Sequence, residues 1–513
     1  MAEYWVNRST GSDSGTGSET DPWYTVPGMT GGNSVTAGDT INVANGQRYP
    51  GRLVLTANNL TYRGYGVASN VLMLEIPHWL LPDVLIVKRV CRQAGTHEGM
   101  WIIDALGETS QGAINYSTRT GCVIEDACVV NALSMSSAVS IGSSAQAQVG
   151  ATMRRCMVDG AVVGISAYRP NTLIEDTAVR NTSDDGITIG TGASQSFHAG
   201  NTVTLRRVSL QNNGFDTASA VGDAVQLFNS TGFQGTMRLE QSLIQRESQI
   251  KQGVMLGTMS GVVEILGCHF DGQGVGSTQI GVAEMTAAGR LRVRRNYWHG
   301  STTNGNPLVR MAAGESGSTG SVADGATILI ENNVADFDSY AGLFSWGSAS
   351  SGTLDGDVTV RQNTCRGLAG NGFSWSAAVG AQTAGTVGAT ASMTVENNAF
   401  IGASPVVFRM PASGENDARW VFRGNRIDGA AAACVVGASA GTSYATVAEF
   451  EAAHSYASVN SEGECQVTNR LTPKPGSPLL DGGYDAGSRR DIRRLQSRRH
   501  VGAYGNARLV EAG

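Results

Sequence analysis

The chain has 513 residues, of which 67 are glycine and only 6% are aromatic, and its formal net charge is −6. A protein whose partner is nucleic acid presents a strongly basic face, so this mildly acidic composition argues against that class. Apolar residues never form a run of transmembrane length, so we expect no membrane insertion, and no stretch has the sustained period of a helical bundle.

The N-terminal segment, residues 1–66, lacks a basic head followed by an apolar run. We therefore expect no secretory signal and synthesis in a cytoplasm. Residues 67–120 are the least regular part of the chain and are interpreted as irregular early coils.

A six-residue pattern recurs about once every 30 residues between residues 121 and 437, which indicates a stack of equivalent turns. Its first and sixth positions are apolar, its second is Glu or Arg in ten of eleven copies, and its fourth is small or Asn. The copies begin at Ile124, Met153, Ile174, Leu205, Leu239, Ile265, Val293, Ile330, Val360, Val395 and Phe422.

Five copies carry asparagine at the fourth position, namely Asn296, Asn333, Asn363, Asn398 and Asn425. Asn tolerates the left-handed conformation of a sharp bend, and its amide both donates and accepts hydrogen bonds. We therefore expect the five to form a structural ladder at the bend of successive coils. Short apolar runs after the bends, such as residues 186–189 and 224–227, predict at least two parallel strands per coil.

Residues 438–513 are predicted to cap the last coil, which otherwise exposes unpaired backbone groups. Within this segment Thr446 is followed three residues later by Glu449, the spacing of a capping box. A short helix is therefore expected to begin there.

The segments Tyr4 to Gly17, Pro22 to Val26 and Ala37 to Val43, with the tail Gly476 to Gly483, resemble right-handed parallel β-helix proteins of the pectate-lyase-like superfamily. The resemblance implies an all-β, right-handed, single-stranded parallel β-helix with short terminal caps. That superfamily includes polysaccharide lyases, glycoside hydrolases, phage tailspikes and proteins without catalysis, so the fold does not fix the activity.

The best candidate for chemistry is the acidic segment Asp184-Asp185-Gly186. If Ile187 and Val225 are equivalent, Asp185 lies beneath Asp223 at the strand spacing of about 4.8 Å, on one solvent-facing wall. Carboxylates this close raise one another's pKa and can divide acid and base roles on a glycosidic bond. The alternative interpretation is that Asp before Gly is ordinary turn chemistry.

Further candidates surround this pair. Glu247 and Lys251 are assigned to the catalytic group, and His198, Trp346 and Trp375 to substrate binding, the tryptophans by stacking on sugar rings. No cofactor is required, although Ca²⁺ is a possible ligand of the carboxylates. The sequence names no metal ligands. Where a lyase of the superfamily presents a basic residue on the strand, this chain has Gln226, and it lacks the hydrolases' Gly-His-Gly motif.

Three classes of function stay open. The first is a phage-type tailspike or tail-fibre β-helix, a receptor-binding virion component that binds, and in one form cleaves, a bacterial surface polysaccharide outside the cell. The resemblance implies a homotrimer for it, with other virion proteins as partners. The second is a polysaccharide lyase or glycoside hydrolase, and the third a non-catalytic virion structural β-helix.

Overall fold

A computed structural model describes residues 1–66, 99–109, 112–116, 119–142, 150–190, 200–213, 222–227, 232–247, 252–273, 279–301, 308–311, 320–337, 342–346, 352–367, 379–381, 386–402, 407–410, 419–429, 434–436 and 442–465. The described strands fall into two compact units, with β1 to β21 in unit 1 and β22 to β45 in unit 2.

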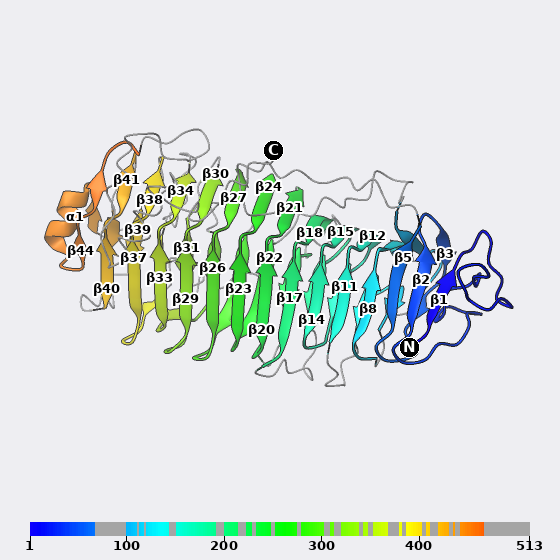
Figure 1. The fold of residues 1–513 in the computed structure, drawn as a ribbon. Helices are drawn as coiled ribbons and strands as arrows, with labels where there is room; N and C mark the ends of the chain where they lie inside the picture. The colour runs from blue at the N-terminus through cyan, green and yellow to red at the C-terminus, as the bar shows by residue number, and fades with distance from the viewer. Residues whose placement is uncertain are drawn as a thin grey trace. The chain divides into compact units, whose positions relative to one another are not determined.

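Each unit is a stack of coils with three strands per coil, such as β8, β9 and β10. Figure 1 shows β8, β11 and β14 of successive coils lying side by side in one sheet. The chain passes through a strand of sheet 1, bends into sheet 2, crosses to sheet 3 and returns to sheet 1 one rung further along. The three sheets are parallel apart from the terminal pairing of β43 with β42, so the fold is the right-handed parallel β-helix that the sequence predicted.

Unit 1 contains the first part of each sheet. Sheet 1 consists of β1 (Glu3–Val6), β2 (Thr40–Ala44), β5 (Thr61–Tyr65), β8 (Cys122–Glu125), β11 (Ala151–Arg154), β14 (Thr172–Glu175), β17 (Thr202–Arg206) and β20 (Thr236–Glu240). Sheet 2 consists of β3 (Arg48–Pro50), β6 (Trp101–Asp104), β9 (Ala127–Ala132), β12 (Met157–Ala161), β15 (Ala178–Thr182), β18 (Ser209–Asn213) and β21 (Leu243–Glu247). Sheet 3 consists of β4 (Leu53–Val54), β7 (Ile114–Asn115), β10 (Val139–Ile141), β13 (Ile165–Ala167), β16 (Ile187–Ile189) and β19 (Val225–Leu227).

Unit 2 repeats the arrangement. Sheet 1 consists of β23 (Val262–Leu266), β26 (Arg290–Arg294), β29 (Thr327–Glu331), β33 (Asp357–Arg361), β37 (Ser392–Glu396), β40 (Trp420–Arg423) and β44 (Ala457–Ser458). Sheet 2 consists of β24 (His269–Gln273), β27 (Tyr297–Ser301), β30 (Val334–Phe337), β34 (Thr364–Gly367), β38 (Ala399–Ile401), β41 (Arg426–Asp428) and β45 (Ser461–Glu462). Sheet 3 consists of β22 (Val254–Met259), β25 (Ile280–Met285), β28 (Val309–Met311), β31 (Phe344–Trp346), β35 (Val379–Ala381), β39 (Phe408–Met410), β42 (Cys434–Val436) and β43 (Thr442–Tyr444). A separate pair is formed by β32 (Thr353–Leu354) and β36 (Thr386–Val387).

The core of each coil is built from the apolar positions of the six-residue pattern. Its first and sixth positions end sheet 1 and enter sheet 2, and both point inward, as the full burial of Ile124 and Val129 illustrates. The same position of successive coils pairs in register, for example Met153 with Ile124 and Ile174. Stacking identical positions therefore produces continuous apolar columns along the inside of the helix.

The sharp bend between sheets 1 and 2 falls on the third position of the pattern. Positive φ angles of 50–58° occur here in copy after copy, including Arg295, Asn332, Gln362 and Asn397, and the bend residues Gly267 and Gly424 have φ of 63°. The sequence analysis gave this left-handed conformation to the asparagines at position four, and that assignment is wrong. The asparagine comes one residue after the bend, where its side chain turns inward.

The five asparagines instead form a hydrogen-bonded ladder inside unit 2. The side-chain amide of Asn333 donates to Asn363 Oδ1 at 2.9 Å, that of Asn363 donates to Asn398 Oδ1 at 3.0 Å, and Asn296 and Asn398 repeat the contact. Each Oδ1 also accepts the backbone N–H of the preceding rung, as in Asn333 N to Asn363 Oδ1 at 2.9 Å. The ladder ends on Asn460, which the pattern did not include.

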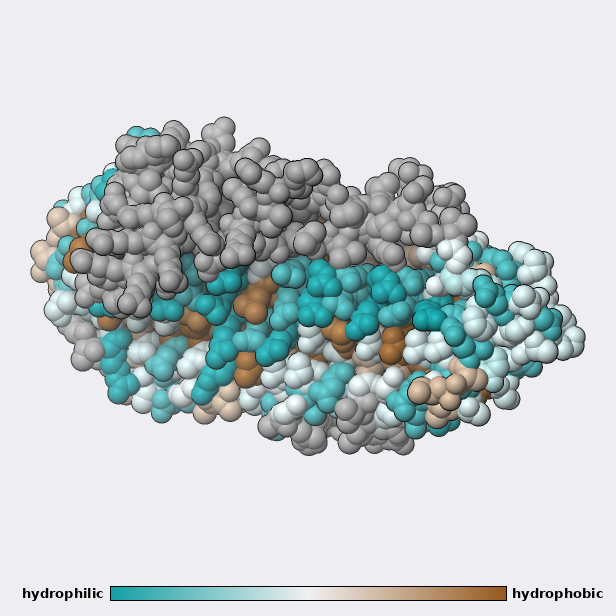
Figure 2. Space-filling model, viewed as in Figure 1, coloured by the Kyte–Doolittle hydropathy of each residue, from teal (hydrophilic) through white to brown (hydrophobic). Residues whose placement is uncertain are grey.

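The second position of the pattern forms a column of alternating charge on the outer edge of sheet 1. In unit 1 the carboxylate of Glu175 contacts Arg154 at 3.1 Å and Arg206 at 2.5 Å. In unit 2 Glu331 contacts Arg294 at 2.8 Å and Arg361 at 2.9 Å. Figure 2 shows hydrophilic side chains gathered over the ends of β8, β11, β14 and β17. Because acidic and basic residues alternate from one coil to the next, their charges cancel along this edge of sheet 1.

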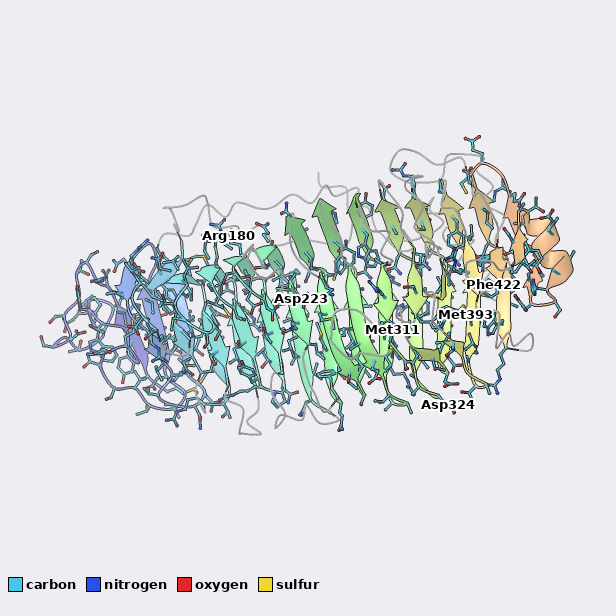
Figure 3. All side chains as sticks on the ribbon, turned by 180° about the vertical axis from the view of Figure 1, so that it is seen from behind. Arg180, Asp223, Met311, Asp324, Met393 and Phe422 are labelled. Carbon is cyan, nitrogen blue, oxygen red and sulfur yellow. The ribbon has the colours of Figure 1, made fainter. Side chains whose placement is uncertain are left out.

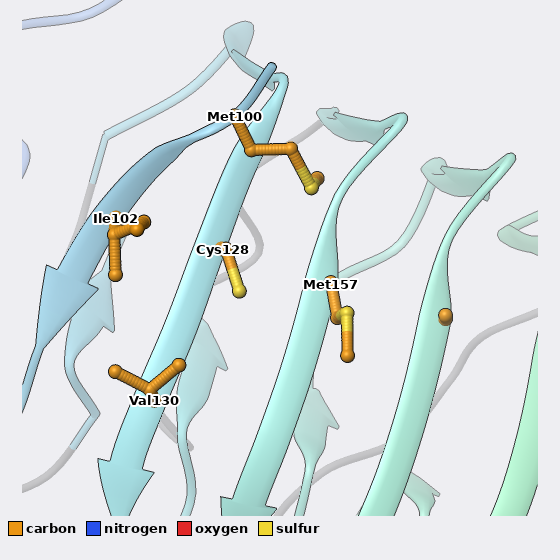
Figure 4. Close-up of a cluster of buried hydrophobic side chains, with 6 residues drawn as sticks. Met100, Ile102, Cys128, Val130 and Met157 are labelled. Carbon is orange, nitrogen blue, oxygen red and sulfur yellow. The ribbon is translucent and has the colours of Figure 1, made fainter. Parts of the chain in front are cut away.

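An apolar cluster also occupies the outer face of sheet 2 in unit 1 (Figure 4). Its side chains alternate with the inward residues of the same strands, and all are at most 7% exposed: Met100, Ile102, Cys128, Val130, Met157 and Ala178. Cys128 is a buried thiol, and burial raises its pKa. A buried thiol of this kind packs as a small hydrophobic group.

The C-terminal cap contains the helix that the sequence predicted. Helix α1 (Val447–Ala453) begins after Thr446, whose side chain accepts the N–H of Glu449 while the Glu449 carboxylate bonds back to the cap backbone. After α1, β44 and β45 add the last rung to sheets 1 and 2, and β43 pairs antiparallel with β42. Among the described residues, no helix combines the length and apolarity needed to span a membrane.

Candidate functional site

The acidic segment lies at the corner between sheets 2 and 3 of unit 1. Asp185 precedes β16 and Asp223 precedes β19, and these strands pair in the expected register, with Ile187 opposite Val225. Gly186 N–H donates to the carbonyl of Asp223 at 2.9 Å, so the two aspartates occupy the same corner of adjacent coils. Figure 3 labels Asp223 at this corner.

The carboxylate of Asp185 is nevertheless turned into the protein. It accepts the backbone N–H of Asp223 at 2.8 Å and the hydroxyl of Thr188 at 3.1 Å, and Asp185 and Asp223 are only 4% and 1% exposed. The expectation of a solvent-facing wall is therefore wrong. The physical reason is that a carboxylate at the corner satisfies the N–H of the next coil, which has no strand partner at that point.

The side chain of Asp184 has a raised pKa. It is half-buried beside Asp185, and burial raises the pKa of its side chain above the ordinary value of aspartate. A carboxyl shifted in this direction is suited to donating a proton. Glu247 ends β21, and only its backbone position is described. Lys251, His198 and Trp375 lie outside the described residues.

Trp346 does not present a face to sugar. Its side chain is fully buried inside unit 2, its indole N–H donates to the carbonyl of Thr386 at 3.1 Å, and its ring stacks near Phe344 at 5.9 Å. Trp298 and Trp420 are also buried. The assignment of Trp346 to substrate binding is therefore wrong, because residues i and i+2 of β31 both point into the core.

Asp185→Ala is expected to lower the free energy of unfolding by about 1–3 kcal/mol, because the buried N–H of Asp223 and the hydroxyl of Thr188 lose their acceptor. If Asp185 has only this structural role, a folded variant should match the parent in any assay of the polysaccharide binding expected from the sequence. Denaturant unfolding measures the first effect. A variant that unfolds like the parent but loses glycan turnover would restore the catalytic interpretation of this corner.

A different group of polar side chains, most of them buried, occurs on the outer side of sheet 2 in unit 2, on β24, β27, β30 and β34. His269 and Tyr297 are neighbours on paired strands, with ring centroids 5.2 Å apart in an edge-to-face arrangement. They are 7% and 4% exposed. The sequence analysis did not identify this pair.

The next outward position of the same strands carries charged residues. Asp336 accepts two parallel hydrogen bonds from Arg366, at 2.7 and 2.8 Å, and the Arg366 side chain stays 28% exposed. By backbone register, His299 pairs with Asp336 and Asp271 pairs with His299. Four consecutive rungs thus place Asp, His, Asp and Arg at one position of the sheet.

The alignment of these four residues could have been predicted from the sequence. The four residues follow directly after the sixth position of their copies, as His299 follows Trp298. Because side chains alternate along a strand, the residue after an inward position belongs to the outer face. Extending the six-residue alignment by one position aligns Asp271, His299, Asp336 and Arg366.

A related ion pair exists in unit 1. Asp159 and Arg180 are paired on β12 and β15 of sheet 2, with 2.7 Å between Asp159 Oδ2 and the Arg180 guanidinium. An Asp–Arg pair on this face is therefore not by itself a mark of function. In unit 2 the imidazole of His269 and the phenol of Tyr297 also lie near the Asp–Arg pair. Among the side chains that the structure describes, no group of three or more His, Cys, Asp or Glu could hold a metal ion.

No protein-family profile matches the chain, and a search of curated proteins found no match. Among solved structures, the chain is similar to a mannuronic-acid-specific polysaccharide lyase of family 6 from human gut microbiota (10% identity, 97% of this chain and 100% of the other, TM-score 0.43). It is also similar to a GH136 lacto-N-biosidase from Eubacterium ramulus (11%, 83% and 67%, 0.38) and to the pectate lyase Pel9A (13%, 83% and 79%, 0.36). At these identities and TM-scores the likeness carries no conclusion about this chain.

Proposed function

We propose that this protein is a phage-type tailspike or fibre-like β-helix that binds a bacterial surface polysaccharide along the outer face of sheet 2 in unit 2. One observation carries the proposal: the bidentate Asp336–Arg366 pair lies at one position of consecutive rungs, beside the His269–Tyr297 ring pair. A polymer of repeated sugars suits a surface whose side chains repeat at the strand spacing of about 4.8 Å.

Each group has a defined part in this proposal. The partly exposed guanidinium of Arg366 donates to sugar hydroxyls, and Asp336 fixes its orientation through two hydrogen bonds. The Tyr297 and His269 rings are 4% and 7% exposed, so they support this face by packing rather than by contact with sugar. Rigid strands hold all of these atoms, so little conformational entropy is lost on binding.

Cleavage of the glycan is a further activity within this proposal. Aspartate and histidine are the residue types that transfer protons in general acid–base catalysis, and Asp271 and His299 occupy register positions next to Asp336. In hydrolysis one carboxylic acid protonates the leaving oxygen while a second carboxylate activates water, and one new reducing end appears per bond. Elimination by a lyase instead produces an unsaturated sugar.

The test is incubation of the protein with polysaccharides purified from the surfaces of candidate host bacteria. Binding, new reducing ends and the absorbance of unsaturated sugars are measured together. Arg366→Ala is expected to weaken binding by about tenfold or more, since a hydrogen bond to a charged group contributes about 1.5–3 kcal/mol. Arg180→Ala, which removes the corresponding arginine of unit 1, is the matched control and should bind like the parent.

The outcome of the control decides the location of the site. If Arg366→Ala binds as tightly as the parent, or if Arg180→Ala is equally impaired, the face of sheet 2 in unit 2 is not the binding surface. Circular dichroism and a melting curve for each variant establish that the comparison is made between folded proteins.

The proposal also covers the location of the protein, its oligomeric state and its partners. We place the protein in a virion, as a homotrimer in contact with other virion proteins, with Ca²⁺ as an optional ligand. A polysaccharide lyase or glycoside hydrolase is the first alternative. The second is a non-catalytic structural β-helix, and two observations favour it: the Asp185 carboxylate accepts a backbone N–H, and the charges along the edge of sheet 1 are paired.

A further inference from the structure

The last asparagine of the ladder in unit 2 donates to a glutamate of helix α1. Inside the ladder, the backbone N–H and the side-chain amide of one asparagine both donate to Oδ1 of the next, as Asn398 does to Asn425 at 3.1 and 3.0 Å. In Asn460 the same two groups donate to Glu451 Oε1, at 2.7 and 2.9 Å. One carboxylate oxygen of α1 therefore takes the place of a further asparagine, and Figure 1 shows α1 beside β44 at this end of the coils.

A second carboxylate connects the last rung with α1 in the opposite direction. Glu462 of β45 accepts the backbone N–H of Val447, the first residue of α1, at 2.5 Å. Apolar burial, by contrast, holds α1 rather than the rung: Phe450 of α1 is 1% exposed, whereas Ser461 and Glu462 are exposed. Residues 458–462, which form the latch segment, contain no buried side chain and are attached by polar contacts.

The backbone of the latch segment is strained at its bend. Val459 has φ of 59° and is 61% exposed. The left-handed conformation is unfavourable for a β-branched residue, and in the eleven copies of the six-residue pattern the bend residue is Asp, Arg, Gln, Asn or Gly. Burial does not compensate for this strain, since most of the valine is in contact with solvent. The hydrogen bonds of the neighbouring Asn460 therefore hold Val459 in this conformation.

A strained segment that polar contacts hold closed is suited to opening locally. We propose that the latch segment is a conformational latch, which Glu451 and Glu462 hold closed and the strain at Val459 drives open. In the open form the segment leaves β40 and β41, while α1 and the earlier coils stay folded. The N–H and amide of Asn425 then lose their acceptor, Oδ1 of Asn460. No residue of the proposed polysaccharide-binding face takes part, so the latch does not depend on the proposed function.

Hydrogen exchange of the backbone amides in the intact protein tests the latch. In the parent, the N–H groups of Asn425 and Asn460 should exchange faster than those of Asn333 and Asn363 inside the ladder. Glu451→Ala should accelerate exchange at Asn425 and Asn460 by about tenfold or more, because hydrogen bonds to a charged acceptor are among the strong ones. Exchange at Asn333 and Asn363 should not change.

Three further variants complete the design. Glu451→Gln keeps an acceptor oxygen and should exchange at a rate between those of the parent and Glu451→Ala. Glu464→Ala removes an exposed glutamate close to the latch segment and, as the matched control, should exchange like the parent. Val459→Asn places at the bend a residue that tolerates the left-handed conformation. Exchange at Asn425 should therefore slow by about fivefold or more, both in this variant alone and when it is combined with Glu451→Ala.

Three results would overturn the inference. One is a Glu451→Ala variant whose exchange at Asn425 and Asn460 equals that of the parent. Another is an equal acceleration at Asn333 and Asn363, which shows that the ladder opens as a whole rather than at its last rung. The third is a Val459→Asn variant that exchanges at the same rate as the parent or faster, because the bend then stores no strain.

Discussion

Asn363→Leu is expected to lower the free energy of unfolding by about 3–5 kcal/mol, one of the largest effects of any single change in this chain. Asn363 is 1% exposed and is a middle rung of the ladder. Leucine has a similar volume but leaves the backbone N–H and amide of Asn333 without an acceptor, and the carbonyl of Ile330 without a donor. Each buried unsatisfied group costs about 1–3 kcal/mol.

Denaturant unfolding monitored by circular dichroism measures this effect. Asn363→Asp is the control, because it keeps the acceptor oxygen of the side chain and removes the amide N–H donor. Its carboxylate still accepts from Asn333 but places an oxygen against the Asn398 Oδ1 and the Ile330 carbonyl. Protonation restores one donor, so the folded state raises the pKa of this new aspartate above its unfolded value of about 3.9. Its stability should therefore be lost as pH rises through the folded pKa and regained at low pH.

A loss below about 1 kcal/mol for Asn363→Leu would contradict the ladder as a source of stability. Asn460→Leu provides the positional comparison. Asn460 accepts from the backbone and amide of Asn425 but is the last rung and only partly buried. Water reaches the groups it leaves behind, so its effect should be clearly smaller than that of Asn363→Leu.

Trp346→Ala is expected to cost about 3–5 kcal/mol, because it removes a fully buried indole from the core of unit 2 and leaves a cavity. Trp346→Phe should cost less, about 1–2 kcal/mol, since it keeps the ring beside Phe344 and loses only the hydrogen bond to Thr386. Thermal and chemical unfolding measure both changes.

The same two variants distinguish core packing from sugar stacking. A buried core tryptophan affects glycan binding only through folding, so Trp346→Phe should bind polysaccharide like the parent at a temperature where both are folded. If Trp346→Phe unfolds like the parent but loses glycan affinity, the indole contacts sugar and our correction of its role is itself wrong.

The sequence could not place the side chains at the corners of the coil. It predicted the register of Ile187 with Val225, and therefore the adjacency of Asp185 and Asp223. It could not show that the Asp185 carboxylate folds back onto the N–H of Asp223, because a short side chain at a corner has both solvent and backbone within reach. Burial of Trp346 depended in the same way on which face of β31 it occupies.

The sequence by itself determined the coil, because the apolar first and sixth positions recur in every copy and only stacked parallel strands bury both of them. It also identified the asparagine column, although it assigned the left-handed bend to the wrong residue. Only the tertiary structure decided which polar groups neutralise one another. Glu175 contacts arginines from neighbouring rungs, and these partners are brought together by coil spacing rather than by nearness in the chain.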